Sequence, residues 1–165
     1  MPLTLDGSCH CGAVRFSCES HAPQPYQRCY CSICRKTAGG GGYAINLLAD
    51  AASMRIEDQD EARRVYQAKL VDDDGQPTTS PAERSFCSRC GSPLWLWDPR
   101  WPELIHPVAS AIDTDLPVPP ESTHILLESK ASWVVPQRGP TDGCFDDYPA
   151  ESIEDWHRSR GLWVE

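Results

Sequence analysis

The chain has 165 residues, of which 40% are hydrophobic, and a formal net charge of -9 at pH 7. This charge argues against nucleic-acid backbones and anionic membranes as partners. No stretch approaches the roughly 20 apolar residues of a membrane span, and the N-terminus lacks the basic start and apolar run of a signal peptide. We therefore expect a cytoplasmic protein that folds as one domain over residues 1–165.

Short strands separated by Gly- and Pro-rich turns are expected along most of the chain. Residues 13–18 alternate apolar and polar side chains, which is typical of a half-buried strand. Further strands are predicted at residues 43–48, 53–57, 64–70, 94–97, 104–110 and 124–128, with an exposed loop at 72–77. Residues 152–161 favour the only good helix, with Ser152 as N-cap and Gly161 as terminator. The fold is therefore expected to be mainly β with a short C-terminal helix.

Seven of the nine cysteines fall into three tight clusters. They are Cys9 and Cys11; Cys29, Cys31 and Cys34; and Cys87 and Cys90. The odd number of cysteines, the lack of a signal peptide and the CxC and CxxC spacings favour metal sites over disulfides in a reducing compartment. The two remaining cysteines differ: Cys18 lies on the apolar face of its predicted strand, whereas Cys144 lies in a Gly- and Asp-containing loop and is a candidate free thiol.

The first and third clusters end in Gly12 and Gly91, as zinc-binding knuckles do, because glycine lets backbone N–H groups fold back onto the sulfurs. Structural zinc is four-coordinate, so pairing these two clusters gives a closed four-cysteine site. The middle cluster then supplies three thiolates and an open position, which is how catalytic zinc is built.

Three segments resemble the glutathione-dependent formaldehyde-activating enzyme family: residues 7–16, 29–36 and 86–94. Residues 124–125 and 129–133 also resemble the family, so the likeness spans about residues 7–134 and leaves 135–165 as a tail without a motif. The resemblance implies the β-tent fold of several coiled antiparallel sheets around a structural zinc. By residue matching, it implies that Cys9, Cys11, Cys87 and Cys90 hold that structural zinc and that Cys29, Cys31 and Cys34 hold an active-site zinc. The activity it implies is a carbon–sulfur lyase reaction joining formaldehyde and glutathione.

A zinc ion with three thiolate ligands can bind a substrate thiol, lower its pKa and present it to an aldehyde carbon. We therefore expect small thiol and aldehyde substrates, possibly glutathione itself, and a second zinc that is lost easily because it has only three protein ligands. Arg35 and Lys36 directly follow the middle cluster and Arg28 precedes it. These cations are candidate contacts for substrate carboxylates, beside the simpler interpretation that they are solvated surface residues.

Two other functions remain open at this stage: a non-catalytic zinc-stabilised binding module, and a zinc hydratase or hydrolase acting on another small carbonyl compound. The run from Gly39 to Gly42 lacks the spacing of a nucleotide-binding loop, so no nucleotide cofactor is expected, and a loose turn is favoured over a flap. Trp133 is expected in the core, with a pocket lining as the alternative. None of the five histidines stands out as a catalyst.

Overall fold

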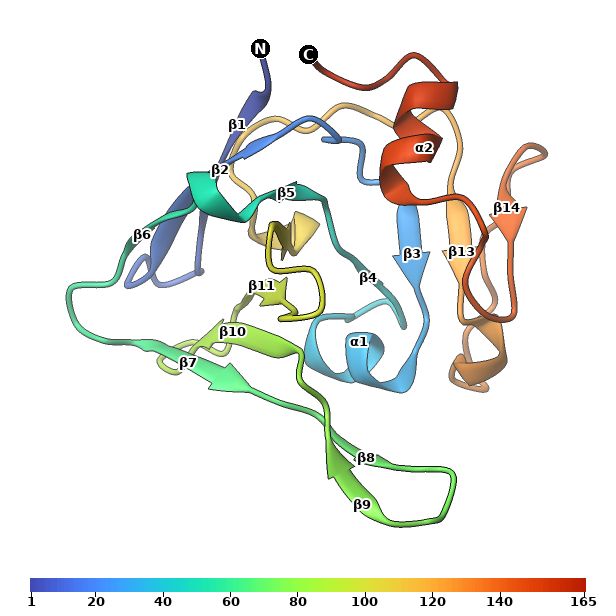
Figure 1. The fold of residues 1–165 in the computed structure, drawn as a ribbon, viewed down its shortest axis with the longest axis horizontal. Helices are drawn as coiled ribbons and strands as arrows, with labels where there is room; N and C mark the ends of the chain where they lie inside the picture. The colour runs from blue at the N-terminus through green and yellow to red at the C-terminus, as the bar shows by residue number, and fades with distance from the viewer.

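The computed structural model describes all 165 residues and contains four β-sheets and two short α-helices (Figure 1). A three-stranded sheet has the order β1 (Leu3–Ser8), β2 (Arg15–Ser20), β6 (Arg55–Glu57). A five-stranded sheet has the order β5 (Ala49–Asp50), β12 (Leu104–Pro107), β11 (Pro93–Trp97), β10 (Glu83–Cys87), β7 (Arg63–Tyr66). Both of these sheets are antiparallel throughout.

The other two sheets are smaller. A four-stranded sheet has the order β14 (Gly143–Cys144), β13 (Thr123–Ile125), β3 (Gln27–Cys29), β4 (Ala44–Ile45), and β13 runs parallel to both of its neighbours. A hairpin of β8 (Lys69–Val71) and β9 (Pro77–Thr79) forms the last sheet. The helices are α1 (Ser32–Thr37) and α2 (Ile153–Ser159), with 3-10 turns at Ala51–Ser53, Ala109–Ala111 and Leu127–Ser129. The expected mainly β architecture with several antiparallel sheets is confirmed.

The main core lies between the three-stranded and the five-stranded sheets. Phe16 from β2 meets Trp95 from β11 edge to face, with ring centroids 5.1 Å apart. Leu5 and Leu94 are completely buried in the same cluster. Burying one such side chain contributes about 1.5–3 kcal/mol. Cys18 is buried here as expected, as a small apolar side chain.

One helix of the structure was not predicted, and one predicted strand is two strands in the structure. Helix α1 begins at Cys31, whose sulfur accepts a hydrogen bond from the Cys34 N–H at 3.3 Å, and cysteine is not among the residues that usually cap helices. The strand expected at 64–70 is broken into β7 and β8, and the loop expected at 72–77 contains the turn of the β8–β9 hairpin. The strand expected at 104–110 ends at Pro107, where the chain enters a 3-10 turn.

The expectation of a loose turn at Gly39–Gly42 was wrong, because both ends of the run are tightly packed. A Cβ atom on Gly39 would lie 2.4 Å from the Tyr43 carbonyl oxygen. Gly42 has a φ of +89°, and its Cβ would lie 2.4 Å from Val134. Trp133, expected in the core, is instead 68% exposed and lies beside Gly42.

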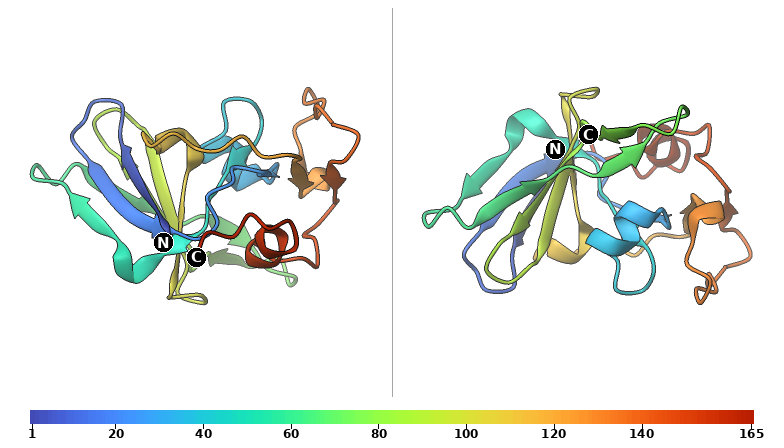
Figure 2. Two further views of the ribbon diagram at one scale, coloured as in Figure 1. Left: turned by 90° about the horizontal axis from the view of Figure 1, so that it is seen from above. Right: turned by 90° about the horizontal axis from the view of Figure 1, so that it is seen from below.

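The last thirty residues contribute β14 to the four-stranded sheet and place helix α2 against Tyr26, just before β3. Helix α2 forms as expected, with the Ser152 hydroxyl accepting from the Asp155 N–H at 3.0 Å. Trp156 of this helix stacks on Tyr26 with ring centroids 3.6 Å apart. The two termini lie side by side (Figure 2), and neither helix reaches the length and apolarity that a membrane crossing needs. That the whole chain forms one domain stays a prediction.

His157 follows Trp156 and is fully buried in its neutral form. Its Nδ1 lies 2.8 Å from the Ile153 carbonyl oxygen, so Nδ1 carries the proton, and its Nε2 accepts the Gln24 N–H at 3.1 Å. A second proton on Nε2 would face that N–H donor. Burial lowers the pKa of His157.

We therefore predict that acid weakens the fold through His157. Its folded-state pKa lies below the unfolded value of about 6.5, so its contribution is complete above that pH and is lost as the pH falls below it. Urea unfolding followed by tryptophan fluorescence between pH 7.5 and 5.5 should show a falling free energy of unfolding, and a shallower fall in His157→Gln. Loss of metal would act on both proteins alike, so equal slopes would contradict the prediction.

Candidate metal centres and the adjacent pocket

The structure brings the first and third cysteine clusters together, although 76 residues separate Cys11 from Cys87. The four sulfurs of Cys9, Cys11, Cys87 and Cys90 lie within 4.8 Å of one another. The Sγ atoms of Cys9 and Cys11 are 3.6 Å apart, and those of Cys11 and Cys87 are 3.8 Å apart. Tetrahedral zinc with Zn–S bonds of about 2.3 Å requires sulfurs about 3.8 Å apart. The four thiols therefore fit a tetrahedral metal ion such as zinc.

The two turns that carry these thiols have matching backbones. Gly12 and Gly91 both have a φ of +76°, a conformation in which a side chain would be strained. The Cys9 N–H donates to the Val14 carbonyl at 3.0 Å, and the Cys87 N–H donates to the Ser92 carbonyl at 2.9 Å. The glycines thus allow each turn to fold its cysteines toward one point.

Ser92 links the two turns. Its hydroxyl accepts the His10 N–H at 3.0 Å and lies 3.2 Å from Cys90 Sγ. Hydrogen bonds from the Ser92 hydroxyl and from backbone N–H groups lower the pKa of Cys90 to about 5. A sulfur that ionises this easily is a ready metal ligand, because metals bind the thiolate.

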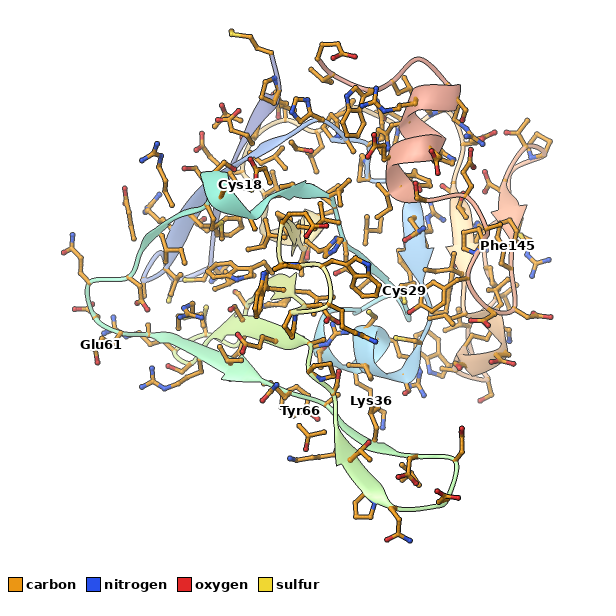
Figure 3. All side chains as sticks on the ribbon, viewed as in Figure 1. Cys18, Cys29, Lys36, Glu61, Tyr66 and Phe145 are labelled. Atoms are coloured by element: carbon orange, nitrogen blue, oxygen red, sulfur yellow. The ribbon has the colours of Figure 1, made fainter.

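The middle cluster forms a second, separate set of three thiols. Cys29 ends β3, Cys31 caps α1 and Cys34 lies within that helix (Figure 3 labels Cys29). Their sulfurs all lie within 4.8 Å of one another. Hydrogen bonds from the Cys29 and Cys34 thiols, and from backbone N–H groups, lower the pKa of Cys31 to about 2. These three thiols could hold a metal ion.

Two side chains from other elements approach Cys34. The Asn46 amide nitrogen and an Arg84 guanidinium nitrogen each lie 3.7 Å from Cys34 Sγ. The Asn46 Oδ1 atom is buried and accepts no hydrogen bond. Arg84 takes part in none of the protein's ion pairs. The thiol set is therefore bordered by a cation and by an unpaired acceptor.

The arginines and the lysine next to the middle cluster differ in exposure. Lys36 is exposed, whereas Arg35 is partly buried. The Nε atoms of Arg28 and Arg35 are both buried without a partner. The Arg28 guanidinium also lies over the Tyr43 ring, 5.3 Å from its centroid. The simple description of solvated surface residues therefore fits Lys36 but not the two arginines.

A pocket adjoins Cys34 through Arg84. Its volume is about 410 Å³, and it lies between the C-terminal end of α1 and the β7–β10–β11 part of the five-stranded sheet. Its lining residues are Thr37, Ala38, Val65, Tyr66, Arg84, Ser85, Phe86, Gly91, Pro93, Trp95, Leu96 and Val108. The size is typical of a pocket for a small organic molecule.

A buried Tyr–His–Asp chain, which no sequence pattern indicated, holds the segment of the middle cluster. The Tyr30 hydroxyl lies 2.8 Å from His124 Nδ1, and His124 Nε2 lies 3.2 Å from Asp142 Oδ2. Backbone N–H groups of Ser122 and Gly139 lower the pKa of Asp142 and keep it ionised. The carboxylate therefore accepts the Nε2 proton, which leaves Nδ1 to accept from Tyr30. The pairing needs three segments far apart in the sequence.

Tyr148, in the C-terminal tail, also lies near the three thiols. Its side chain is 68% exposed, yet desolvation raises its pKa, and the nearby Cys29, Cys31 and Cys34 raise that pKa further. Its hydroxyl therefore stays protonated at neutral pH. Of the remaining cysteines, Cys144 is exposed and belongs to neither set of thiols.

We predict that the two thiol sets contribute unequally to the free energy of unfolding. Cys90→Ser removes a ligand from the four-thiol set and should cost several kcal/mol, because binding free energy in a structural metal site is folding free energy. Cys31→Ser should lower the zinc content by about one ion per chain with a smaller loss of stability. Elemental analysis and thermal unfolding of both variants test this, with Cys144→Ser as the unchanged control. Equal destabilisation by Cys90→Ser and Cys31→Ser would contradict it.

The Tyr–His–Asp chain predicts a penalty for Tyr30→Phe. The substitution leaves the buried His124 Nδ1 without a donor, which costs about 1–3 kcal/mol. Tyr43→Phe is the matched control, because the neighbouring Tyr43 ring lies 5.3 Å from Tyr30 and its hydroxyl has no partner in the protein. Denaturant unfolding of the two variants should separate them by that amount. Equal midpoints would show that the hydrogen bond contributes nothing.

The sequence and the structure both resemble those of known proteins. Residues 4–129 match the family model described as glutathione-dependent formaldehyde-activating enzyme. A Halomonas elongata protein, named provisionally as such an enzyme, is 58% identical over 160 residues, or 97% of this chain and 98% of its own length. The crystal structure of a Rhodobacter sphaeroides protein has 27% identity and a TM-score of 0.50, covering 68% of this chain and 91% of that one. The chain therefore belongs to the family of glutathione-dependent formaldehyde-activating enzymes.

Proposed function

We propose that the protein is a zinc-dependent carbon–sulfur lyase that forms or cleaves an S-hydroxymethyl adduct of glutathione or a related small thiol. In the forward direction, a sulfur–carbon bond forms, the carbonyl π bond opens and the thiol proton ends on the new hydroxyl. We place the reaction in the cytoplasm, because seven clustered thiols stay reduced there.

The observation that carries this proposal is the division of the thiols into a closed set of four and an open set of three beside a pocket. The closed set needs no further ligand and serves the fold. Cys29, Cys31 and Cys34 would hold the second zinc, which supplies a Lewis acid that stabilises a thiolate at neutral pH. A domain that used zinc for stability alone would have no need of the open set.

Asn46 supports an oxygen-containing adduct. Its buried Oδ1 atom has no donor, while its amide nitrogen lies 3.7 Å from Cys34 Sγ. Buried acceptors are nearly always paired, so an unpaired one beside a reaction centre fits a donor that arrives with the substrate. The hydroxyl of an S-hydroxymethyl group would be such a donor.

The cations next to the thiols would offset their charge and hold the substrate. Arg84 lies against Cys34, and the buried Nε atoms of Arg28 and Arg35 are unpaired donors. Arginine binds carboxylates through a fork of N–H groups, so we assign Arg35 a contact with a substrate carboxylate. The exposed Lys36 would contribute mainly long-range attraction.

The test is the rate at which free glutathione exchanges with its formaldehyde adduct, measured by NMR exchange spectroscopy. The zinc-loaded protein should accelerate the exchange, and Cys31→Ser should return it to the uncatalysed rate, because a thiolate of the open set is lost. Cys144→Ser is the matched control, since this thiol is exposed and outside both sets. Circular dichroism should show that both variants stay folded.

Two results would point elsewhere. If the zinc-loaded protein accelerates no thiol–aldehyde exchange, the lyase proposal fails and a non-catalytic zinc-stabilised binding module takes its place. If it converts a carbonyl compound at the same rate with and without thiol, the protein is a zinc hydratase or hydrolase.

A further inference from the structure

We propose that the pocket beside Cys34 binds the apolar body of a substrate larger than formaldehyde, a molecule that ends in one carbonyl, carboxylate or S-hydroxymethyl group held by Arg84. The reaction of this substrate depends on the proposed function. Its binding depends only on the pocket, the pocket lining and the single cation there.

Strand register places the polar group at one point of the pocket. In the five-stranded sheet, Arg84 of β10 stands directly opposite Tyr66 of β7 and opposite Leu96 of β11. Directly paired residues share a face of an antiparallel sheet. Arg84 is therefore flanked on both sides by large apolar or aromatic side chains. The pair Phe86 and Pro93 follows two positions further along β10, after a shift in register.

The rim of the pocket is apolar where it meets solvent. Val65 is 43% exposed and Tyr66 is 44% exposed, and both lie on the edge strand β7. Trp95 and Val108 are buried parts of the lining. A cavity of about 410 Å³ with such walls gains most from a ligand that brings apolar surface.

Arg84 has donors to spare for a ligand. A guanidinium has five N–H donors, and the protein provides one partner for Arg84, the Cys34 sulfur. Arg84 is the only charged residue in the lining. The pocket therefore suits a ligand with one anionic or carbonyl oxygen group and an apolar remainder. Glutathione carries two carboxylates and an ammonium group, which the apolar walls would leave unpaired.

The pocket orients the ligand toward the three thiols. Because an Arg84 nitrogen lies 3.7 Å from Cys34 Sγ, an oxygen bound to Arg84 lies at the thiol end of the pocket, and the apolar body extends away from it along the sheet. Helix α1, which carries Cys34, closes this side next to β10 (Figure 1). Formaldehyde has no body to fill this space, so the occupant is either an aldehyde with an apolar substituent or a thiol with one.

The first experiment measures binding without chemistry. The probe is 3-phenylpropionate, which has an apolar ring and one carboxylate and carries no thiol or aldehyde. Titration calorimetry, with intrinsic tryptophan fluorescence as a second readout, should show saturable binding to the wild type. Arg84→Gln should weaken it about tenfold or more, as expected for a lost charge-assisted hydrogen bond. Ala38→Phe should block it by filling the pocket.

Two controls make the result specific. Arg55→Gln removes an exposed arginine from β6, in a different sheet, and should leave binding unchanged. Cys144→Ser should also retain binding, because this exposed thiol lies outside both thiol sets and outside the pocket lining. S-methylglutathione should bind more weakly than 3-phenylpropionate. If 3-phenylpropionate does not bind to the wild type, or if it binds to Arg84→Gln and Ala38→Phe as tightly as to the wild type, the proposal is overturned.

The second experiment identifies the substrate that carries the apolar body. Adduct exchange is measured for glutathione with 3-phenylpropanal and for 2-phenylethanethiol with formaldehyde, each against glutathione with formaldehyde. Acceleration of either substituted pair, and its loss in Ala38→Phe, supports the proposal and shows whether the aldehyde or the thiol carries the apolar body. Acceleration of glutathione with formaldehyde alone, unaffected by Ala38→Phe, contradicts the proposal while leaving the lyase function standing. Probe binding without any exchange activity supports the binding site and removes the lyase function instead.

Discussion

The convergence of four sulfur atoms from two turns is the constraint on which the rest of the structure depends. Cys9 and Cys11 lie in the turn that joins β1 to β2, whereas Cys87 and Cys90 lie in the turn that joins β10 to β11. These two hairpins belong to the two sheets that enclose the main core, so a metal at this point fixes one sheet against the other. Cys9 and Cys87 are themselves buried members of that core. The four-thiol set and the apolar core are thus parts of one structure, and the ordering of each depends on the other.

The three cysteine clusters could be predicted from the sequence because they depend on local spacing, and the pairing of the first and third clusters was predicted from their matching glycine-ended turns. CxC and CxxC clusters place their sulfurs within reach of one ion whatever the rest of the chain does, and glycines mark the two matching turns. The strand-rich architecture was also predictable from short apolar segments between turns. Other contacts between distant segments could not be predicted. The Tyr30–His124–Asp142 chain, the approach of Asn46 and Arg84 to Cys34, and the pocket each bring together residues from separate strands or loops.

Local errors in the sequence analysis have physical causes of the same kind. A cysteine took the place of the usual oxygen-bearing N-cap residue, so α1 was missed. The glycine run was interpreted as loose because glycine allows freedom, whereas here Gly39 and Gly42 are required by close packing against Tyr43 and Val134. Trp133 was expected in the core by its size, yet it lies exposed beside Gly42, at the edge of the segment that carries the three thiols.

The sulfur of Cys31 has two tasks, since it caps α1 and belongs to the open thiol set. A helix of six residues is too short to be stable in water by itself, so its order depends on this cap and on packing. Order in α1 and ligand binding at the open set are therefore linked through one atom, and thermodynamic linkage works in both directions. A ligand that changes the order of α1 would change the affinity of the three thiols for their ion, and the ion would then change the affinity for that ligand by the same factor.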